Sequence, residues 1–324
     1  MGMEALISRR LEVRSGAEQE INAILSGSRQ VWGMGITQED YVEYHRLVRH
    51  HPWSEKNFQH LVLGDELGDI FSSCKLYLHQ IKADGQLYRV GSIGAVFTPS
   101  VYRSKGYARQ MLEHLLDRLR EDGYDLAMLF SDIGTEFYAR FNFRVVRKYD
   151  PVYAFLNGKR ERAQVMIYEF LPPELLDWHL RYAAGQRFSL VRSPDYFQLL
   201  SDRITWHRRY MGFREQRVIV SREDSSYLWV DLSRFRIILR DFGTASPNPA
   251  HALSGLLSGL RAKHGFKELG GWLPNDFDNY SFLQLKEKRL RSKTVLMISA
   301  LSKKAEAVFK LPDDQIHFWL ADYF

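Results

Sequence analysis

The chain has 324 residues, which is long enough for two domains of ordinary size. Hydrophobic residues make up 45% and aromatic residues 14% of the sequence, and this composition excludes a disordered or low-complexity chain. The formal net charge is +6, but 45 basic residues are scattered among 39 acidic ones. Because no basic block stands out, we expect no nucleic-acid partner.

The cysteine content and the N-terminus indicate a cytoplasmic protein. Cys74 is the only cysteine, so the chain can form neither an intramolecular disulfide nor a thiolate metal cluster. Arg9 and Arg10 follow a short apolar patch, which reverses the order of a secretory signal. No apolar run approaches the roughly 20 residues that a bilayer requires. We therefore expect a cytoplasmic location and no membrane partner.

The first elements are two helical patterns and a strand pair. Residues 17–49 carry helical spacing on both sides of the loop Gly33-Met34-Gly35, and the second pattern ends before Pro52. Residues 74–81 alternate in period two, Ala83-Asp84-Gly85 provides a hairpin turn, and residues 87–97 continue as a strand. We predict an antiparallel pair.

The next elements predict a mixed α/β sheet. Residues 107–121 repeat apolar side chains at three-four spacing, and Asp122-Gly123 is typical of a helix end. Residues 124–131 are predicted as a buried strand, 134–140 as a short helix and 143–149 as another strand. The order of strands and helices implies helical crossovers within one sheet.

The second half indicates another α/β unit. A polar stretch at residues 157–162 and a helical start at 171–174 place a boundary between about 150 and 190. Strands are predicted at 216–222, 226–232 and 234–241, and a helix at 250–263. We expect domains at 1–155 and 191–324, joined by 156–190. The similar order of elements fits either a degenerate internal repeat or two unrelated units.

The junction at residues 90–108 carries the strongest chemical signal. A strand ends there, a short basic loop follows, and a long helix begins at a glycine. The first N–H groups of a helix lack partners within the helix and carry the positive end of its dipole, so they can bind a pyrophosphate. Gly106 permits close approach, Arg103 and Lys105 add charge, and Ala108 leaves room. The alternative is an ordinary helix with a basic first turn.

The segment from Arg103 to Ala108, followed by an amphipathic helix, resembles the acyl-CoA pyrophosphate loop of GNAT acetyltransferases. Residues 134–143 are similar to the next segment of that family, although Asn142 stands where many members have glycine. The resemblance implies a GNAT fold followed by a second α/β domain, with acetyl-CoA as co-substrate and no metal. It also implies cofactor contacts from Val96, Phe97, Thr98, Arg103, Ser104, Lys105, Gly106, Tyr107 and Ala108.

A closer resemblance concerns the acceptor. His51-Pro52-Trp53, Ser72-Ser73-Cys74, residues 92–99 and the extra C-terminal half resemble fungal lysine acetyltransferases, which modify the side-chain amine of the free amino acid. This implies a small-molecule amine substrate, with free L-lysine first. Acetylation of protein lysines or aminoglycosides, and a silent acyl-CoA-binding regulatory module, remain as alternatives.

Acetyl transfer needs an acid, a base and a hydrogen-bond donor for the carbonyl oxygen. Tyr138 matches the family tyrosine that protonates the leaving thiolate, although it could instead pack in an aromatic cluster. A backbone N–H near Phe97 or Thr98 is expected to polarise the carbonyl. Asp132 is the candidate base, because a lysine amine has a pKa of about 10.4 and must lose a proton. The base could also come from Glu136, Glu39, Asp40 or the terminal carboxylate of the tail 317–324.

The second half is expected to wall the substrate pocket and to bind no coenzyme. Its loop at residues 243–249 falls where a repeated phosphate loop would lie, but it has no glycine-x-alanine ending. Trp229, Trp272 and Asp276 are candidates for that wall. His45, His50 and His51 lack the spacing of two ligands on one helical face, so they indicate no metal site.

Overall fold

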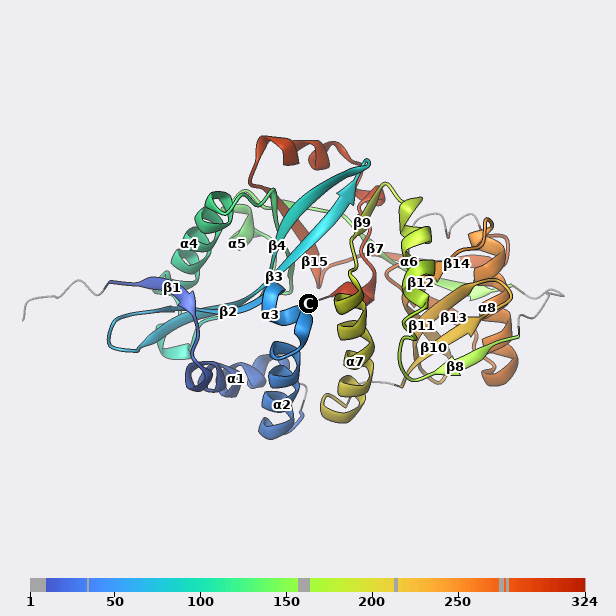
Figure 1. The fold of residues 1–324 in the computed structure, drawn as a ribbon, viewed down its shortest axis with the longest axis horizontal. Helices are drawn as coiled ribbons and strands as arrows, with labels where there is room; N and C mark the ends of the chain where they lie inside the picture. The colour runs from blue at the N-terminus through green and yellow to red at the C-terminus, as the bar shows by residue number, and fades with distance from the viewer. Residues whose placement is uncertain are drawn as a thin grey trace, which may run out of the picture.

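The computed structural model describes residues 10–33, 35–156, 164–212, 215–273, 277 and 280–323. The predicted features at Met34, at 157–162, at Asp276 and at Phe324 lie outside these residues. The chain forms two mixed sheets that lie beside each other, with helices on their faces (Figure 1). This confirms the predicted α/β class with mixed sheets.

The first sheet has the strand order β1-β2-β3-β4-β5-β15-β6, and β9 pairs with β3. β3 and β4 form the predicted hairpin around Asp84 and Gly85, whose φ angles of 46° and 79° suit a tight two-residue turn. The strands are β1 (Glu12–Ser15), β2 (Phe58–Gly64), β3 (Ile70–Ala83), β4 (Gln86–Phe97), β5 (Leu126–Ser131), β6 (Arg144–Val145), β9 (Phe188–Leu190) and β15 (Val295–Ala300).

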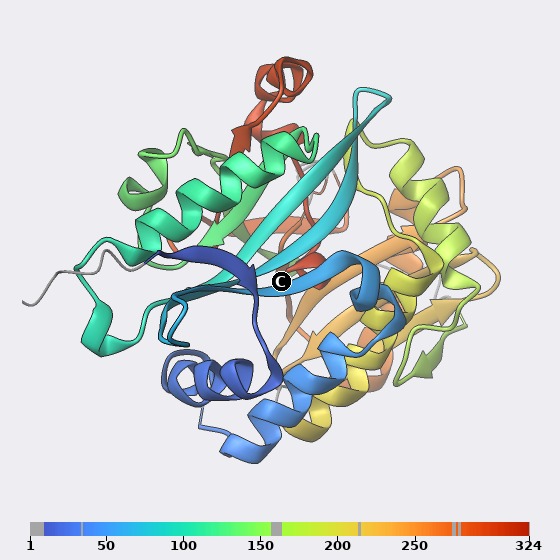
Figure 2. The same cartoon turned by 60° about the vertical axis from the view of Figure 1, so that its left-hand side comes forward.

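Helices cover both faces of the first sheet (Figure 2). The amphipathic helix α4 (Tyr107–Glu121) occupies the predicted residues, and its leucine stripe packs against Leu61, Leu76 and Leu129 of the sheet. On the other face, Ile24 of α1 packs on Val62 and Phe97. The remaining helices of this half are α1 (Glu18–Trp32), α2 (Gln38–Arg49), α3 (Pro52–Asn57) and α5 (Glu136–Ala139).

The second sheet has the order β14-β7-β13-β12-β11-β10-β8. Its unit β12–α8–β13 repeats the topology of β4–α4–β5, because in both cases the helix connects two parallel neighbouring strands. The elements are β7 (Tyr149–Phe155), β8 (Met166–Tyr168), β10 (Gln216–Ser221), β11 (Ser226–Leu232), β12 (Arg236–Thr244), β13 (Glu268–Gly271), β14 (Leu283–Leu290), α6 (Leu175–Ala184), α7 (Pro194–Tyr210) and α8 (Pro249–His264). None of the described helices combines the length and apolar character needed to cross a membrane.

Three strands join the sheet of the other half of the chain, and β9 is one of them through its pairing with β3. β7 follows the first sheet in sequence but pairs with β13 and β14 of the second sheet. β15 comes from near the end of the chain and lies between β5 and β6 of the first sheet. The predicted boundaries near 155 and 191 stay predictions, and the sheets do not follow chain order.

Some expected elements differ in the structure. The strand expected at 143–149 is the two-residue β6, and a separate strand begins at Tyr149. The end predicted before Pro52 is also the start of α3, because the side chain of His51 caps the Trp53 N–H at 3.2 Å and Pro52 occupies the first turn.

A buried ion cluster joins the C-terminal tail to the second sheet. Arg192, just after β9, contacts Asp241 of β12 at 2.6 Å and Asp322 of the C-terminal tail at 2.9 Å. The Tyr227 hydroxyl donates to Asp241 at 2.6 Å. All three charged side chains are almost completely buried. The cluster therefore ties the tail to the second sheet.

Replacement of Arg192 by Met should destabilise the protein by about 3–5 kcal/mol, because it leaves two carboxylates buried without their cation. Urea unfolding followed by circular dichroism measures this loss. Arg187→Met is the matched control, since Arg187 makes a two-pronged pair with Asp84 at the surface. That pair should contribute less than about 1 kcal/mol. Equal losses in the two variants would contradict the structural role of the buried cluster.

Candidate functional site

The loop before α4 presents an open helix N-terminus. Gly106 is the N-cap residue with φ +88°, and no side chain caps the helix there. The first bond within the helix runs from the Gln110 N–H to the Gly106 carbonyl, so the preceding N–H groups have no partner in the helix. Residues 103–106 are exposed to solvent. These N–H groups are therefore available to an anion.

The charges around this helix start are positive. Arg103 and Lys105 are exposed, and the first turn of α4 holds no acidic residue. The Arg103 Nε donates to the Thr98 carbonyl at 3.0 Å, which fixes the loop against the end of β4. Tyr107 directs its ring inward onto Phe71, with ring centroids 4.6 Å apart. The loop thus offers backbone donors, two cations and the positive end of a dipole.

The corresponding helix start in the second half, that of α8, is capped by a side chain, unlike the start of α4. Asn248 is the N-cap of α8, and its side-chain oxygen accepts from the His251 N–H at 3.1 Å. A side chain therefore occupies the position that Gly106 leaves open in α4. The expectation that the second half binds no coenzyme stays a prediction.

β4 and β5 separate beside the α4 loop. Their parallel pairing ends at Ile93 and Leu129, although β4 continues to Phe97 and β5 to Ser131. β4 also bulges here, because Lys75 pairs with Gly94 and Ser73 with Phe97, which leaves two residues of β4 opposite Cys74. One of them, Ala95, has φ +47°. Backbone groups at the end of β4 are thereby released from the ladder with β5.

At the end of β4, the side chains of the predicted cofactor contacts touch other parts of the protein. Phe97 is buried, and its ring meets Trp32 edge-on at 6.3 Å. Val96 packs against the α4 core, and the Thr98 hydroxyl lies 3.2 Å from the Ser72 hydroxyl. These side chains contact other protein groups, so a contact with the acetyl group would come from the backbone of the same residues.

Tyr138 lies buried on the α4 side of the first sheet. It belongs to the same apolar cluster as Phe141, Phe143 and Cys74. Burial, together with the nearby Cys74 and Asp132, raises the pKa of its hydroxyl to about 12. Cys74 stands opposite the β4 bulge. The hydroxyl therefore remains protonated near neutral pH in the region where the strands separate.

Asp132 follows directly after β5 and is exposed. Its Oδ1 accepts from the Thr294 N–H at 2.9 Å, at the start of β15. Burial and the neighbouring Asp132 raise the pKa of Tyr323, in the C-terminal tail, to about 12. Asp132 thus lies between the end of β5, the start of β15 and the tail.

The other predicted bases have different surroundings. Asp40 accepts from the Thr37 hydroxyl at 2.9 Å at the start of α2, which is a local capping arrangement. Glu39 in the same turn is exposed, and so is Glu136 in α5. The tail approaches Asp132 through Tyr323.

A cation cluster on the other face of the sheet was not predicted. We define it as Lys75, Arg203, His45 and His60, from β3, α7, α2 and β2. Lys75 is 8% exposed, and its Nζ lies 3.2 Å from the His45 Nδ1. Arg203 donates to the Tyr323 carbonyl at 3.2 Å. The signal in the sequence was a lysine within the alternating pattern of a buried strand.

Burial controls ionisation in the cation cluster. It lowers the pKa of Lys75 to about 7, with a further contribution from Arg203. Burial and the charge of Lys75 lower the pKa of His60 to about 3 and hold that of His45 well below its usual value. Both imidazoles are therefore neutral at neutral pH.

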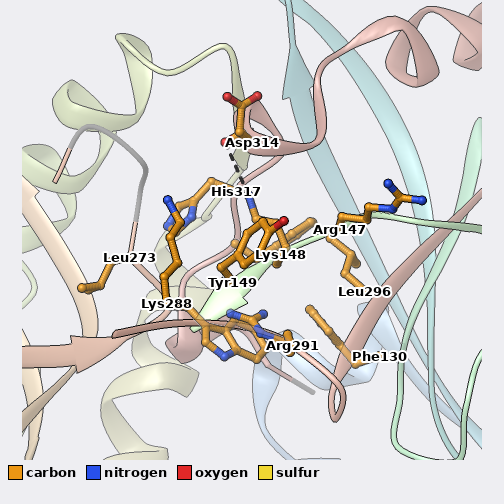
Figure 3. Close-up of a pocket in the computed structure, with 12 residues that line it drawn as sticks. Phe130, Arg147, Lys148, Tyr149, Leu273, Lys288, Arg291, Leu296, Asp314 and His317 are labelled. Carbon is orange, nitrogen blue, oxygen red and sulfur yellow. Dashed lines mark hydrogen bonds between the residues drawn. The ribbon is translucent and has the colours of Figure 1, made fainter. Parts of the chain in front are cut away.

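A cavity of about 80 Å³ lies on the far side of β5 (Figure 3). Phe130 of β5 and Trp272 line it, whereas the predicted wall residue Trp229 is buried in the core. Two of the cations that line it already contact protein groups. Lys148 donates to the Asp313 carbonyl at 3.0 Å, and Arg291 pairs with Asp150 at 2.8 Å. The described residues contain no cluster of His, Cys, Asp or Glu that could hold a metal ion.

Comparison with known proteins gives a family match for the first half of the chain. Residues 12–146 match the family described as the acetyltransferase (GNAT) domain. The match covers less than half of the chain, from β1 to just after β6, and this part is similar to a GNAT acetyltransferase domain. No curated protein matches the sequence.

Solved structures share the fold over most of the chain. A probable N-acyltransferase from Enterococcus faecalis is 12% identical, with 91% of this chain and 74% of that one covered at a TM-score of 0.66. A GCN5-related N-acetyltransferase from Kribbella flavida is 14% identical, with 92% and 73% covered at 0.67. Another from Anabaena variabilis is 16% identical, with 90% and 73% covered at 0.66. The similarity extends beyond the GNAT domain into the second half.

Replacement of Lys75 by Met should stabilise the protein at pH 6 more than at pH 9.5. The folded pKa of Lys75 is about 7, whereas an unfolded lysine has a pKa of about 10.4. The folded state therefore loses the proton first, and stability of the wild type rises as pH increases between these values. The full difference corresponds to at most about 5 kcal/mol. Charged and titratable groups around Lys75 are His45, His60, Arg203, Arg49 and Tyr77.

Thermal unfolding of both proteins across this pH range measures the effect. Lys82→Met is the matched control, because Lys82 lies on the same strand and is partly exposed. It should show no such pH trend. A constant stability difference between wild type and the Lys75 variant would contradict a buried lysine with a lowered pKa.

Proposed function

We propose that the protein transfers an acetyl group from acetyl-CoA to a primary amine. The observation that carries this proposal is the open N-terminus of α4 at Gly106, beside the point where β4 and β5 separate. The helix start offers donors for a pyrophosphate, and the separated strands offer backbone groups for the rest of the cofactor. The family match of residues 12–146 supports this reading.

Different residues of the chain would bind different parts of acetyl-CoA. Backbone N–H groups at the start of α4, including those of Tyr107 and Ala108, would hold the pyrophosphate, with Arg103 and Lys105 as countercharges. Ser104, with φ +61°, and Gly106 shape the loop. The backbone of residues 96–98 would lie beside the acetyl carbonyl. Acetyl-CoA supplies the activated thioester.

The transfer needs two proton movements. The acceptor nitrogen forms a bond to the carbonyl carbon while the bond from that carbon to sulfur breaks. We propose that Tyr138 donates its proton to the leaving sulfur, because the pKa of about 12 keeps it protonated. The amine gives up its proton to a base, for which Asp132 is the candidate at the end of β5.

We propose free L-lysine as the first acceptor to test, because of the sequence resemblance to lysine acetyltransferases. His51 and Trp53, which contribute to that resemblance, have structural roles: His51 caps α3, and Trp53 stacks on His79 at 5.2 Å. They therefore add no direct support for lysine. Protein lysines, aminoglycosides and a silent sensor remain the alternatives.

Replacement of Gly106 by Asp should weaken acetyl-CoA binding at least tenfold, because it puts a carboxylate where the pyrophosphate would lie. Isothermal titration calorimetry measures the affinity, and thiol release with L-lysine measures turnover. Gly85→Asp is the matched control. Gly85 has a similar φ of +79°, and a new Cβ at either glycine meets no atom within 4 Å. Both variants therefore carry similar backbone strain.

Equal affinity for acetyl-CoA in the two glycine variants would overturn the cofactor site at α4. Tight binding in the wild type without turnover of L-lysine, a peptide panel or aminoglycosides would favour the sensor.

Replacement of Tyr138 by Phe should lower kcat by about 10²–10⁴ and leave acetyl-CoA affinity unchanged, because it removes only the acid. Stopped-flow and steady-state thiol release measure the rate. Tyr124→Phe is the control, since the ring of Tyr124 lies under Arg89 at 4.2 Å at the end of α4. An unchanged kcat in the Tyr138 variant would contradict the role of Tyr138 as the acid and would mean that this tyrosine only packs in the core.

A further inference from the structure

Tyr323 of the C-terminal tail contacts the end of β5 on the face opposite α4. Leu129 packs in the apolar cluster under α4, and successive residues of a strand point to opposite faces, so Phe130 projects away from α4. The rings of Tyr323 and Phe130 meet edge-on with their centroids 5.4 Å apart. The Tyr323 hydroxyl hydrogen-bonds to the side chain of Asp132. Tyr323 therefore reaches the proposed base from the face opposite Tyr138.

Asp132 accepts hydrogen bonds from two segments that are distant in sequence. Its Oδ1 accepts from the Thr294 N–H at 2.9 Å, and its carboxylate also accepts from the Tyr323 hydroxyl. Because burial and Asp132 raise the pKa of Tyr323 to about 12, the hydroxyl stays protonated and can donate near neutral pH. An exposed aspartate samples several rotamers, and two donors from separate segments restrict it. The start of β15 and the tail together therefore set the direction of the remaining lone pairs of the carboxylate.

Three contacts fix the position of Tyr323 itself. The preceding residue, Asp322, is bound by the buried Arg192 at 2.9 Å. The carbonyl of Tyr323 accepts from Arg203 at 3.2 Å, and its ring meets Trp272 edge-on with the centroids 5.9 Å apart. Arg192, Arg203 and Trp272 all belong to the second half of the chain. The second half therefore determines where the Tyr323 hydroxyl lies.

We propose that Tyr323 is a positioning residue, whose hydroxyl holds the Asp132 carboxylate in the orientation that accepts a proton from the acceptor amine. This proposal rests on the proposed acetyltransferase function and extends its site to the tail. The amine nitrogen bonds to the acetyl carbon and gives one proton to Asp132, while the carbon–sulfur bond breaks and Tyr138 gives one proton to the sulfur. Asp132 is exposed, so it can pass its proton on to water. Tyr323 neither gains nor loses a proton in this step.

The two tyrosines near the gap between β4 and β5 have different tasks in this arrangement. Tyr138 packs in the apolar cluster under α4 together with Cys74. Tyr323 lies on the other face, and its hydroxyl already donates to Asp132. A tyrosine hydroxyl has a single proton to donate, so this bond keeps Tyr323 from protonating the leaving sulfur. The acid and the base therefore act from opposite faces of the sheet.

A double-mutant cycle between Tyr323→Phe and Asp132→Asn tests whether Tyr323 acts through Asp132. Thiol release from acetyl-CoA with L-lysine, a peptide panel and aminoglycosides gives kcat and KM for each accepted amine. Asp132→Asn should lower kcat by about 10²–10⁴, because it removes the base. Tyr323→Phe should lower kcat about tenfold and leave KM for acetyl-CoA unchanged, because it removes one hydrogen bond to a charged group. With Asn at position 132, the same Phe substitution should change kcat by less than about twofold.

The Phe variant separates the hydroxyl of Tyr323 from its packing, because it keeps the ring that meets Phe130 and Trp272. Tyr88→Phe is the matched control. The Tyr88 hydroxyl donates to Gln86 at 3.3 Å in the hairpin of β3 and β4, and its loss should leave kcat unchanged. Thermal unfolding of every variant verifies that the fold is intact. A role in packing alone would lower kcat by the same factor whether residue 132 is Asp or Asn.

The outcomes separate the two proposals. A loss of kcat in Tyr323→Phe that disappears in the Asn background, with Tyr88→Phe unaffected, supports the positioning role. An unchanged kcat in Tyr323→Phe, or equal losses in both backgrounds, would overturn that role while acetyl transfer stands. Full activity of Asp132→Asn would overturn the base and the positioning role together, again with acetyl transfer intact. Acetyl-CoA binding without turnover of any amine in the wild type would overturn the transferase function, and the role of Tyr323 with it.

Discussion

The candidate site depends on the position of β15 in the first sheet. β5 leaves β4 after Leu129, and this separation would leave the end of β5 without a hydrogen-bonded neighbour. β15 supplies one, because Leu296 pairs with Phe130 and Val295 with Ser131 on the opposite edge. The last residues of β5 are therefore held in the sheet on one side while they are released on the other. The gap beside the α4 loop is stable for this reason.

The residues after β15 bring the second half to the site. The tail runs back to Asp322, which Arg192 binds together with Asp241 of the second sheet. The next residue, Tyr323, lies beside Asp132, and its carbonyl accepts a hydrogen bond from Arg203. The loop before α4 and the separated ends of β4 and β5 come from the first half, with β15 as the added neighbour of β5. The cation cluster on the other face combines β2, β3 and α2 with α7, and its Arg203 contacts the tail.

Features set by neighbouring residues could be predicted from the sequence. The leucine stripe of α4 and the turn at Asp84 and Gly85 are local patterns, and the structure confirms both. The open helix start at Gly106 was also visible, since glycine is the residue that tolerates φ +88° there. The roles assigned to Tyr138 and Asp132 stay predictions.

Features set by distant residues could not be predicted. β14 carries mostly exposed charged residues and pairs through its backbone with β7, so its side chains gave no buried pattern. β15 has an apolar sequence, but nothing in it indicates that it joins β5 from the other half of the chain. The cation cluster combines four elements, and only the fold brings Arg203 of α7 close enough to Lys75 of β3 for its charge to lower the pKa of that lysine.

The return of β15 also constrains how the protein can be made. Ribosomes add about 5–20 residues per second, so on the order of 10–30 seconds pass between the synthesis of β5 and that of its partner strand β15. During that time the nascent first sheet has an apolar strand with one open edge. Such an edge can pair with other chains, so folding during translation needs this strand to be shielded by a chaperone or by the unfinished chain itself. The order of synthesis thus makes the first sheet the last part of the fold to be completed.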